Sequence, residues 1–144
     1  SWQPTHELDV NLDNRLRLIG FDAETQDVKP GQTWPLTLYW QTDAQLDQDY
    51  TVFVHLVDDA GTIIAQGDEP PLKGFYLTSA WKPGEILNDT HAVTLPDDLR
   101  PGRYQVFVGL YDPATGYRLP VLDQAGVTVD NQVLVATVDV AAAR

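Results

Sequence analysis

Short runs in which apolar residues recur at every second position constrain the fold of this chain more than any other feature. Turn residues, mainly Pro, Gly, Asp and Asn, separate the runs. No stretch long enough for a helix keeps helical spacing of its apolar residues without a Pro or Gly inside it. The pattern therefore predicts β-strands. They are expected at residues 15–23, 34–42, 50–58, 62–68, 86–95, 103–112, 117–122 and 132–140.

The connections between these runs contain residues that favour tight turns. Pro30 precedes Gly31, as in a type II turn. Residues 58–61 and 112–116 each end in Gly, which is typical of hairpin loops. Strands joined in this way predict an all-β fold, an immunoglobulin- or fibronectin III-like antiparallel β-sandwich of about seven to nine strands. We expect residues 1–144 to form one domain, with a core at about 16–140.

A tyrosine near the start of the run 103–112 supports this fold class. Tyr104 comes two residues after a Pro-Gly turn formed by Pro101 and Gly102. In immunoglobulin-like sandwiches, a Tyr at this place often donates a hydrogen bond to the backbone just upstream. We therefore expect Tyr104 to form such a corner.

The runs 50–58 and 103–112 are predicted to be neighbouring central strands with two apolar faces. Alternation places Val52, Val54 and Leu56 together on the inner face. The outer face would then carry Phe53, His55, Val57, Phe107 and Tyr111. A bare apolar patch of this size is unusual on a monomer, so we expect another segment to cover it.

The long loop at residues 68–85 has the composition of such a cover. It contains three prolines, two glycines and the aromatic residues Phe75, Tyr76 and Trp81. Each buried aromatic side chain would stabilise a docked loop by roughly 1.5–3 kcal/mol. We therefore predict that the loop is a lid over the outer patch. The alternative is a ligand cleft at the rim of this lid, where Tyr76, Trp81 and His55 contact a sugar.

Charged residues at the two ends of this loop suggest how it is anchored. Asp68 begins the loop, and Asp89 follows it. Arg118 comes just after the 112–116 hairpin. A charge pair among these residues would hold the lid in place, and a contact with a ligand is the alternative role.

The charge and the residue inventory exclude several classes of function. The chain has 9 Lys and Arg residues against 21 Asp and Glu residues, a formal net charge of −12, so nucleic acid and anionic membranes are poor partners. The absence of Cys excludes disulfides and zinc–thiolate sites. No G-x-S-x-G, H-E-x-x-H or glycine-rich nucleotide motif occurs. We predict no enzyme activity, no catalytic residue and no cofactor; a hydrolase with an unpatterned carboxylate pair stays an open alternative.

Two short motifs carry weaker signals. Residues 9–13 resemble the start of a calcium-binding loop, but Asn14 and Gly20 stand where that loop needs Gly and Glu. We therefore expect a solvated turn and predict no metal site. Asn88 opens an N-x-T sequon, which we interpret as the start of a strand.

The chain contains no Met, even at position 1, and no apolar run of the roughly 18 residues that span a bilayer. We therefore expect a part excised from a longer protein. Any signal or membrane anchor would lie in that parent, and we predict no direct membrane insertion by this fragment.

Several segments taken together resemble one family. They are LTLYWQ shortly after Pro30-Gly31, DYTVFVHLVDDAG, AQGDEPP, TSAWKPGE and LRPGRYQVFVGLYDPATGYRLPV. The combination covers about 16–140 and resembles a β-sandwich domain at the exported C-terminal end of multispanning bacterial glycosyltransferase-like membrane proteins. Those proteins resemble lipid-linked-sugar-dependent mannosyltransferases. The resemblance implies a membrane-anchored parent and a place outside the cytoplasm, and it transfers no catalytic residue. The recurrent positions that it implies are His55, Gln66, Asp68, Pro71, Trp81, Gly84, Glu85, Tyr111 and Arg118.

These observations predict a non-catalytic accessory domain at the cell surface that binds carbohydrate or positions a glycan for its parent. Aromatic faces stack on sugar rings, and acids accept hydrogen bonds from sugar hydroxyls. The residues predicted to contact a ligand are His55, Asp68, Tyr76, Trp81, Tyr111 and Arg118. A structural spacer or protein-interaction module without a small ligand is the alternative.

Overall fold

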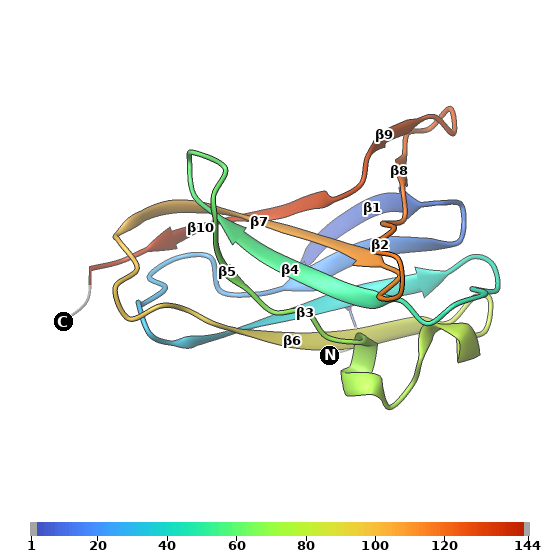
Figure 1. The fold of residues 1–144 in the computed structure, drawn as a ribbon, viewed down its shortest axis with the longest axis horizontal. Coiled ribbons are helices and arrows are strands. Elements are labelled where there is room, and N and C mark those ends of the chain that lie inside the picture. The colour runs from blue at the N-terminus through green and yellow to red at the C-terminus, as the bar shows by residue number, and fades with distance from the viewer. Residues whose placement is uncertain (1–2, 143–144) are drawn as a thin grey trace.

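The computed structural model describes residues 3–142 and shows two packed antiparallel sheets (Figure 1). The described residues form ten strands and two short 3-10 helices. The elements are β1 (His6–Leu12), β2 (Leu16–Asp22), β3 (Thr33–Thr42), β4 (Thr51–Val57), β5 (Ile63–Gln66), η1 (Pro71–Gly74), η2 (Thr78–Ala80), β6 (Ile86–Thr94), β7 (Gly102–Tyr111), β8 (Val121–Leu122), β9 (Thr128–Asp130) and β10 (Val133–Val140).

The strand order confirms the predicted sandwich. One sheet runs β6-β3-β2-β1-β8-β9, and the other runs β10-β7-β4-β5. The three strands β6-β3-β2 facing β10-β7-β4-β5 have the order found in immunoglobulin-like folds. As predicted, the runs 50–58 and 103–112 are neighbours, with Val54 opposite Val108. The count of ten exceeds the predicted seven to nine because two strands that were not predicted, β1 and β9, also join the first sheet.

The predictions for two segments, residues 9–13 and 117–122, are wrong. Residues 9–13 are mostly strand, because β1 pairs with β2 on one side and β8 on the other. The predicted strand 117–122 is reduced to β8. Its first half instead lies beside the end of β7, where Arg118 bridges to Tyr111 and the Leu119 N–H donates to the Leu110 carbonyl. The chain then crosses to the other sheet, so no single straight strand can form.

The core lies between the inner faces of the two sheets. Val52, Val54 and Leu56 all point into it from β4, as alternation predicts. The tyrosine corner is also confirmed, since the Tyr104 hydroxyl donates to the Arg100 carbonyl at 2.7 Å. This bond ties the start of β7 to the turn before it.

The loop at residues 68–85, called the crossing loop below, does not cover the outer patch, so that prediction is wrong. It joins β5 at the edge of one sheet to β6 at the edge of the other. The chain must therefore cross the open side of the sandwich, and Trp81 fills the core there with 0 % of its surface exposed. The Thr78 hydroxyl donates to the Gln48 carbonyl at 2.6 Å and accepts from the Tyr50 N–H at 2.9 Å.

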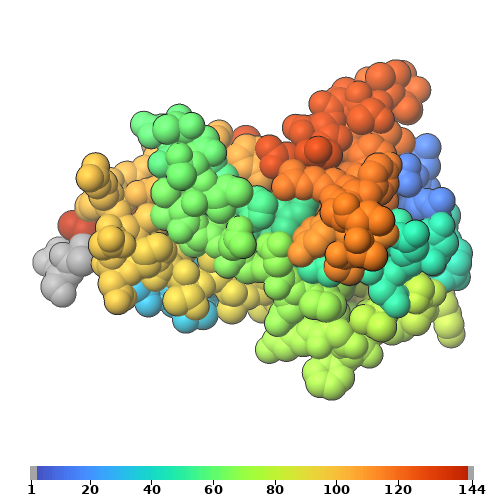
Figure 2. All heavy atoms as spheres, in the orientation of Figure 1, coloured from blue at the N-terminus to red at the C-terminus, as the bar shows by residue number. Residues whose placement is uncertain are grey.

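The molecule projects on two sides beyond the body of the sandwich. The space-filling view shows the crossing loop bulging at the bottom and the β8–β9 hairpin standing out at the top (Figure 2). In the part of the chain from residue 3 to residue 142, no helix is long and apolar enough to cross a bilayer.

Candidate functional site

The outer face of the four-stranded sheet is built around Phe53. This ring is 1 % exposed although it points away from the core between the sheets. Its cross-strand partner is Gly109, and a Cβ atom at that position would lie only 2.5 Å from the Phe53 ring. The missing side chain therefore lets the ring lie across β7. The His55 ring packs beside it, with ring centroids 4.7 Å apart.

Arg118 covers the Phe53 ring, which has room to lie across β7 because residue 109 is a glycine. Its guanidinium carbon lies 4.2 Å from the Phe53 ring centroid, within the range of a cation–π contact. One N–H of the guanidinium donates to Asn131 Oδ1 at 3.3 Å. Within residues 3–142, no carboxylate lies within 4.0 Å of Arg118 or of the exposed Arg100, whereas Arg15, Arg17 and Arg103 all form ion pairs. Arg118 is therefore held by an aromatic face and an amide rather than by an acid.

Three of the predicted residues form the side of the patch nearest the crossing loop. The Tyr111 hydroxyl donates to Asp68 at 3.0 Å, and His55 Nε2 lies 3.9 Å from the same carboxylate. Burial, followed by the bond to Asp68, raises the pKa of Tyr111. Burial lowers the pKa of His55; Asp68 acts in the opposite direction, and Arg118 reinforces the lowering. The lowered pKa favours the neutral form of His55 at pH 7.

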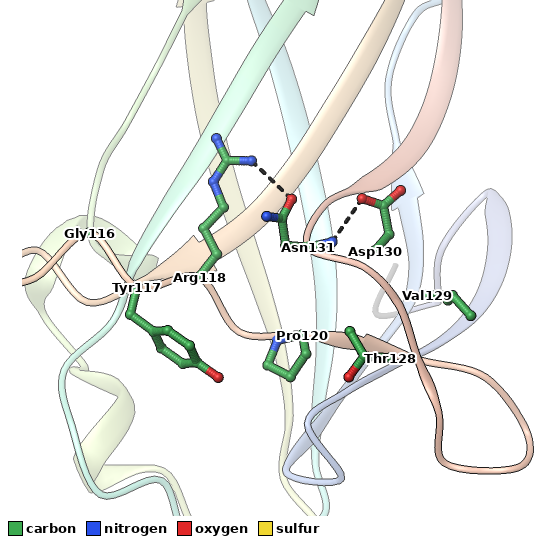
Figure 3. Close-up of a pocket in the computed structure, with 8 residues that line it drawn as sticks. All are labelled: Gly116, Tyr117, Arg118, Pro120, Thr128, Val129, Asp130 and Asn131. Carbon is green, nitrogen blue, oxygen red and sulfur yellow. Dashed lines mark hydrogen bonds between the residues drawn. The ribbon is translucent and has the colours of Figure 1, made fainter.

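An open groove lies on the other side of Arg118, between the 112–118 hairpin and the β8–β9 hairpin (Figure 3). Its volume is about 730 Å³. The lining residues, called the Arg118 groove below, are Gly116, Tyr117, Arg118, Pro120, Thr128, Val129, Asp130 and Asn131. Tyr117 is 59 % exposed, and in Figure 3 its ring extends from the chain on the side opposite to the Arg118 guanidinium. The groove thus joins an aromatic face to a hydroxyl, an amide, an acid and a cation.

A second hollow of about 350 Å³ adjoins the outer patch. Arg118 lines this hollow as well as the groove, and His55, Phe107 and Asp59 line it too. Arg118 is thus shared by the two concave regions.

The structure brings together His55, Asp68, Tyr111 and Arg118 but separates them from Tyr76 and Trp81. The prediction that Trp81 stacks on a ligand is wrong for this structure, because its ring is fully buried and its Nε1 donates to the Tyr76 carbonyl at 2.8 Å. The Tyr76 hydroxyl donates to Glu85 at 2.6 Å, a bond that raises the pKa of Tyr76. Both aromatic side chains therefore stabilise the crossing loop itself.

The sequence alone did not point to Tyr117, Thr128, Asp130 or Asn131 as site residues. Tyr117 follows a hairpin glycine and gives no alternation signal of its own. The other three lie in or beside β9, a strand whose residues are all exposed. A signal was present only in composition, since 127–131 combine apolar and polar residues next to a tight turn.

Asp89 anchors the crossing loop, but not through a charge pair with Arg118 as predicted. It is fully buried and accepts the Leu72 N–H at 2.8 Å and the Trp40 Nε1–H at 3.1 Å. His91 Nε2 lies 2.6 Å from the same carboxylate. The crossing loop is thus anchored by buried polar residues of β6 and not by an ion pair at the surface.

The segment that resembles a calcium loop and the N-x-T sequon at Asn88 are local structural features. Asn11 Oδ1 accepts the Asn14 N–H at 2.9 Å in the turn between β1 and β2. Asn88 lies in β6 with its side chain on the exposed face. Across the described range, 3–142, no group of three or more His, Asp or Glu residues could hold a metal ion.

Comparison with known proteins adds information on the fold. No family model and no curated protein matches the chain. The C-terminal domain of Wzt, a β-sandwich, is similar with a TM-score of 0.58 and 8% identity, over 99% of this chain and 83% of that one. The CARDB domain of a Pyrococcus furiosus protein, solved with di-metal ions, aligns with a TM-score of 0.46 and 13% identity, over 99% of this chain and 97% of that one. At such identities the likeness shows the fold alone.

Proposed function

We propose that this protein is a non-catalytic accessory domain that binds carbohydrate in the Arg118 groove. The observation that carries the proposal is the combination of residues there. An exposed aromatic ring, Tyr117, lines the same groove as the hydroxyl of Thr128, the amide of Asn131 and the carboxylate of Asp130. Sugars offer an apolar ring face and several hydroxyls, and a binding site needs both kinds of partner.

The backbone around Tyr117 is fixed, which favours binding. The Asp112 N–H donates to the Tyr117 carbonyl at 2.8 Å, and the Tyr117 N–H donates to Thr115 Oγ1 at 3.2 Å. A platform that is already ordered loses little conformational entropy when a ligand binds. The backbone that carries Tyr117 is thus already ordered before a ligand binds.

The setting of the domain is part of the proposal. The segments that resemble the exported domains of glycosyltransferase-like membrane proteins support a place outside the cytoplasm, attached to a membrane-anchored parent. In that setting the domain would hold or orient a glycan chain near the enzyme. The strongly acidic surface agrees with a sugar ligand rather than a nucleic acid.

A glycan array probed with three proteins tests the proposal. The wild-type domain is expected to retain a subset of glycans, and Tyr117→Ala is expected to lose them. Phe75→Ala is the matched control, because Phe75 is a 91 % exposed aromatic residue on the crossing loop, away from the groove. Retention by all three proteins, or by none, would contradict the proposal.

A protein-interaction module is the second candidate function. It is favoured by the apolar side chains on β9 and its turn, where Val127 is 58 % exposed and Val129 is 60 % exposed. Substituting both by Thr would abolish binding of a protein partner through this edge. Val127→Thr alone changes no residue that lines the Arg118 groove, so this single variant is expected to weaken binding of a protein partner and to keep any glycan binding.

A further inference from the structure

Arg118 stands out among the basic residues of the groove and its surroundings. Its guanidinium has five N–H groups, and only one bond from it, to Asn131, is formed within the described part of the chain. The remaining donors have no acid within 4.0 Å among residues 3–142, in a chain with 21 acidic residues. Arg100 also lacks an ion pair within residues 3–142, but it is exposed, whereas Arg118 is half-buried and lines the groove. The free donors of Arg118 therefore point to an acceptor that the ligand supplies.

The geometry also fixes the guanidinium in position. The Phe53 ring supports one face at 4.2 Å, and Asn131 holds one edge at 3.3 Å. Arg118 is half-buried, so its charge is less screened by water than that of a fully exposed side chain. A planar, oriented guanidinium matches the two oxygens of a carboxylate better than it matches single hydroxyls.

We infer that Arg118 makes the groove selective for a sugar that carries a carboxylate, such as a uronic acid, within a mostly neutral glycan. This inference rests on the proposed function and names the ligand class of the same groove. The carboxylate pairs with the free edge of Arg118, and a sugar ring farther along the glycan stacks on Tyr117, whose ring lies on the opposite side of the chain.

The acids nearby restrict the ligand to a low charge density. Asp130 lines the same groove, and Asp59 lines the adjoining hollow. The lowered pKa of His55 favours its neutral form, so this ring adds little positive charge. With a net charge of −12, the domain repels a dense polyanion at long range, and only a short-range pair with Arg118 offsets this repulsion. A heparin-like chain is therefore not a ligand.

Calorimetric titration with two matched probes tests the inference. One is a tetrasaccharide of alternating glucose and glucuronic acid, and the other is the same tetrasaccharide with its carboxyl groups reduced to alcohols. The wild-type domain is expected to bind the acidic probe at least tenfold more tightly. Arg118→Gln is expected to bind both probes equally, and Arg118→Lys to keep part of the preference, because a lysine retains the charge without the planar fork.

The outcomes separate this inference from the proposed function. Equal binding of the two probes by the wild-type domain, or a preference for the reduced one, overturns the acidic-sugar inference and leaves a carbohydrate site. The same conclusion holds when the array retains only neutral glycans. An array that retains nothing overturns both. Because the comparison of probes needs only the wild-type domain, a variant that fails to fold does not block the test.

Discussion

The crossing loop and the Arg118 groove use similar residues for opposite purposes. Both contain aromatic, proline and glycine residues: three aromatics, three prolines and two glycines in the crossing loop, and one of each in the groove. Both also include chain that passes from one sheet to the other. In the crossing loop, Trp81 turns inward and its polar atom bonds within the loop. In the groove, Tyr117 turns outward, and its ring is 59 % exposed. Aromatic content alone therefore does not distinguish the two regions; the direction of each ring does.

The largest expected effect tests the structural side of this comparison. Trp81→Ala removes a fully buried ring and leaves a cavity in the core, so the free energy of unfolding should fall by about 3–5 kcal/mol. Urea denaturation of the two proteins measures the difference. Phe75→Ala, in the same loop but exposed, should change stability by less than about 0.5 kcal/mol. Similar losses for the two variants would show that the loop does not separate inner from outer aromatics in this way.

The next effect tests how the outer patch supports the groove. Gly109→Ala places a Cβ atom 2.5 Å from the Phe53 ring, so the ring must move and Arg118 with it. Overpacking of this kind costs about 1–3 kcal/mol. Glycan affinity should fall along with the free energy of unfolding.

A double variant provides the control for Gly109. Phe53→Leu removes the ring that collides with the new methyl group. Gly109→Ala should therefore cost much less stability in the Phe53→Leu background than in the wild type, as a double-mutant cycle measures. Equal costs in the two backgrounds would rule out the ring as the source of the strain.

A smaller effect concerns the tyrosine corner. Tyr104→Phe removes the hydrogen bond to the Arg100 carbonyl and should lower the free energy of unfolding by about 1 kcal/mol. Tyr117→Phe is the matched control, because no hydrogen bond from that hydroxyl is formed within residues 3–142. Thermal and urea unfolding of the two variants measure the contrast. An unchanged free energy of unfolding in the Tyr104→Phe variant would mean that the corner does not stabilise the fold.

The smallest effect is a dependence on pH. The pKa of His55 lies below its ordinary value of 6.5, mainly because burial disfavours the charged ring. As the pH falls through 6.5, the unfolded state takes up a proton before the folded state does, so stability decreases. The wild-type domain should therefore lose more stability than His55→Gln between pH 7.5 and pH 5.5, as urea titrations at the two pH values would show. Identical losses would mean that His55 titrates alike in both states.

Much of the fold could be predicted from the sequence, because alternation is a local signal. The two-faced apolar pattern of β4 and β7, and the corner at Tyr104, come directly from it. Strand β1 could also have been predicted, since Leu8, Val10 and Leu12 alternate in His6–Leu12. The resemblance of residues 9–13 to a calcium loop obscured that pattern. Strand β9 offers no such signal, because all its residues are exposed.

The site was harder to predict because it depends on where the chain crosses between sheets. Four of the six predicted residues meet on the outer face, since β4, β7 and the 117–119 segment are adjacent there. The other two, Tyr76 and Trp81, belong to the crossing loop. Their position depends on β5 and β6 lying in different sheets, a long-range fact that local patterns do not contain.

Backbone amide NMR of the isotope-labelled domain, titrated with a glycan retained on the array, tests most directly which region takes the ligand. The account predicts that the amide shifts change at residues 116–119 and 128–131 and stay constant at 71–85. Shift changes concentrated in 71–85, with 116–119 unaffected, would contradict it.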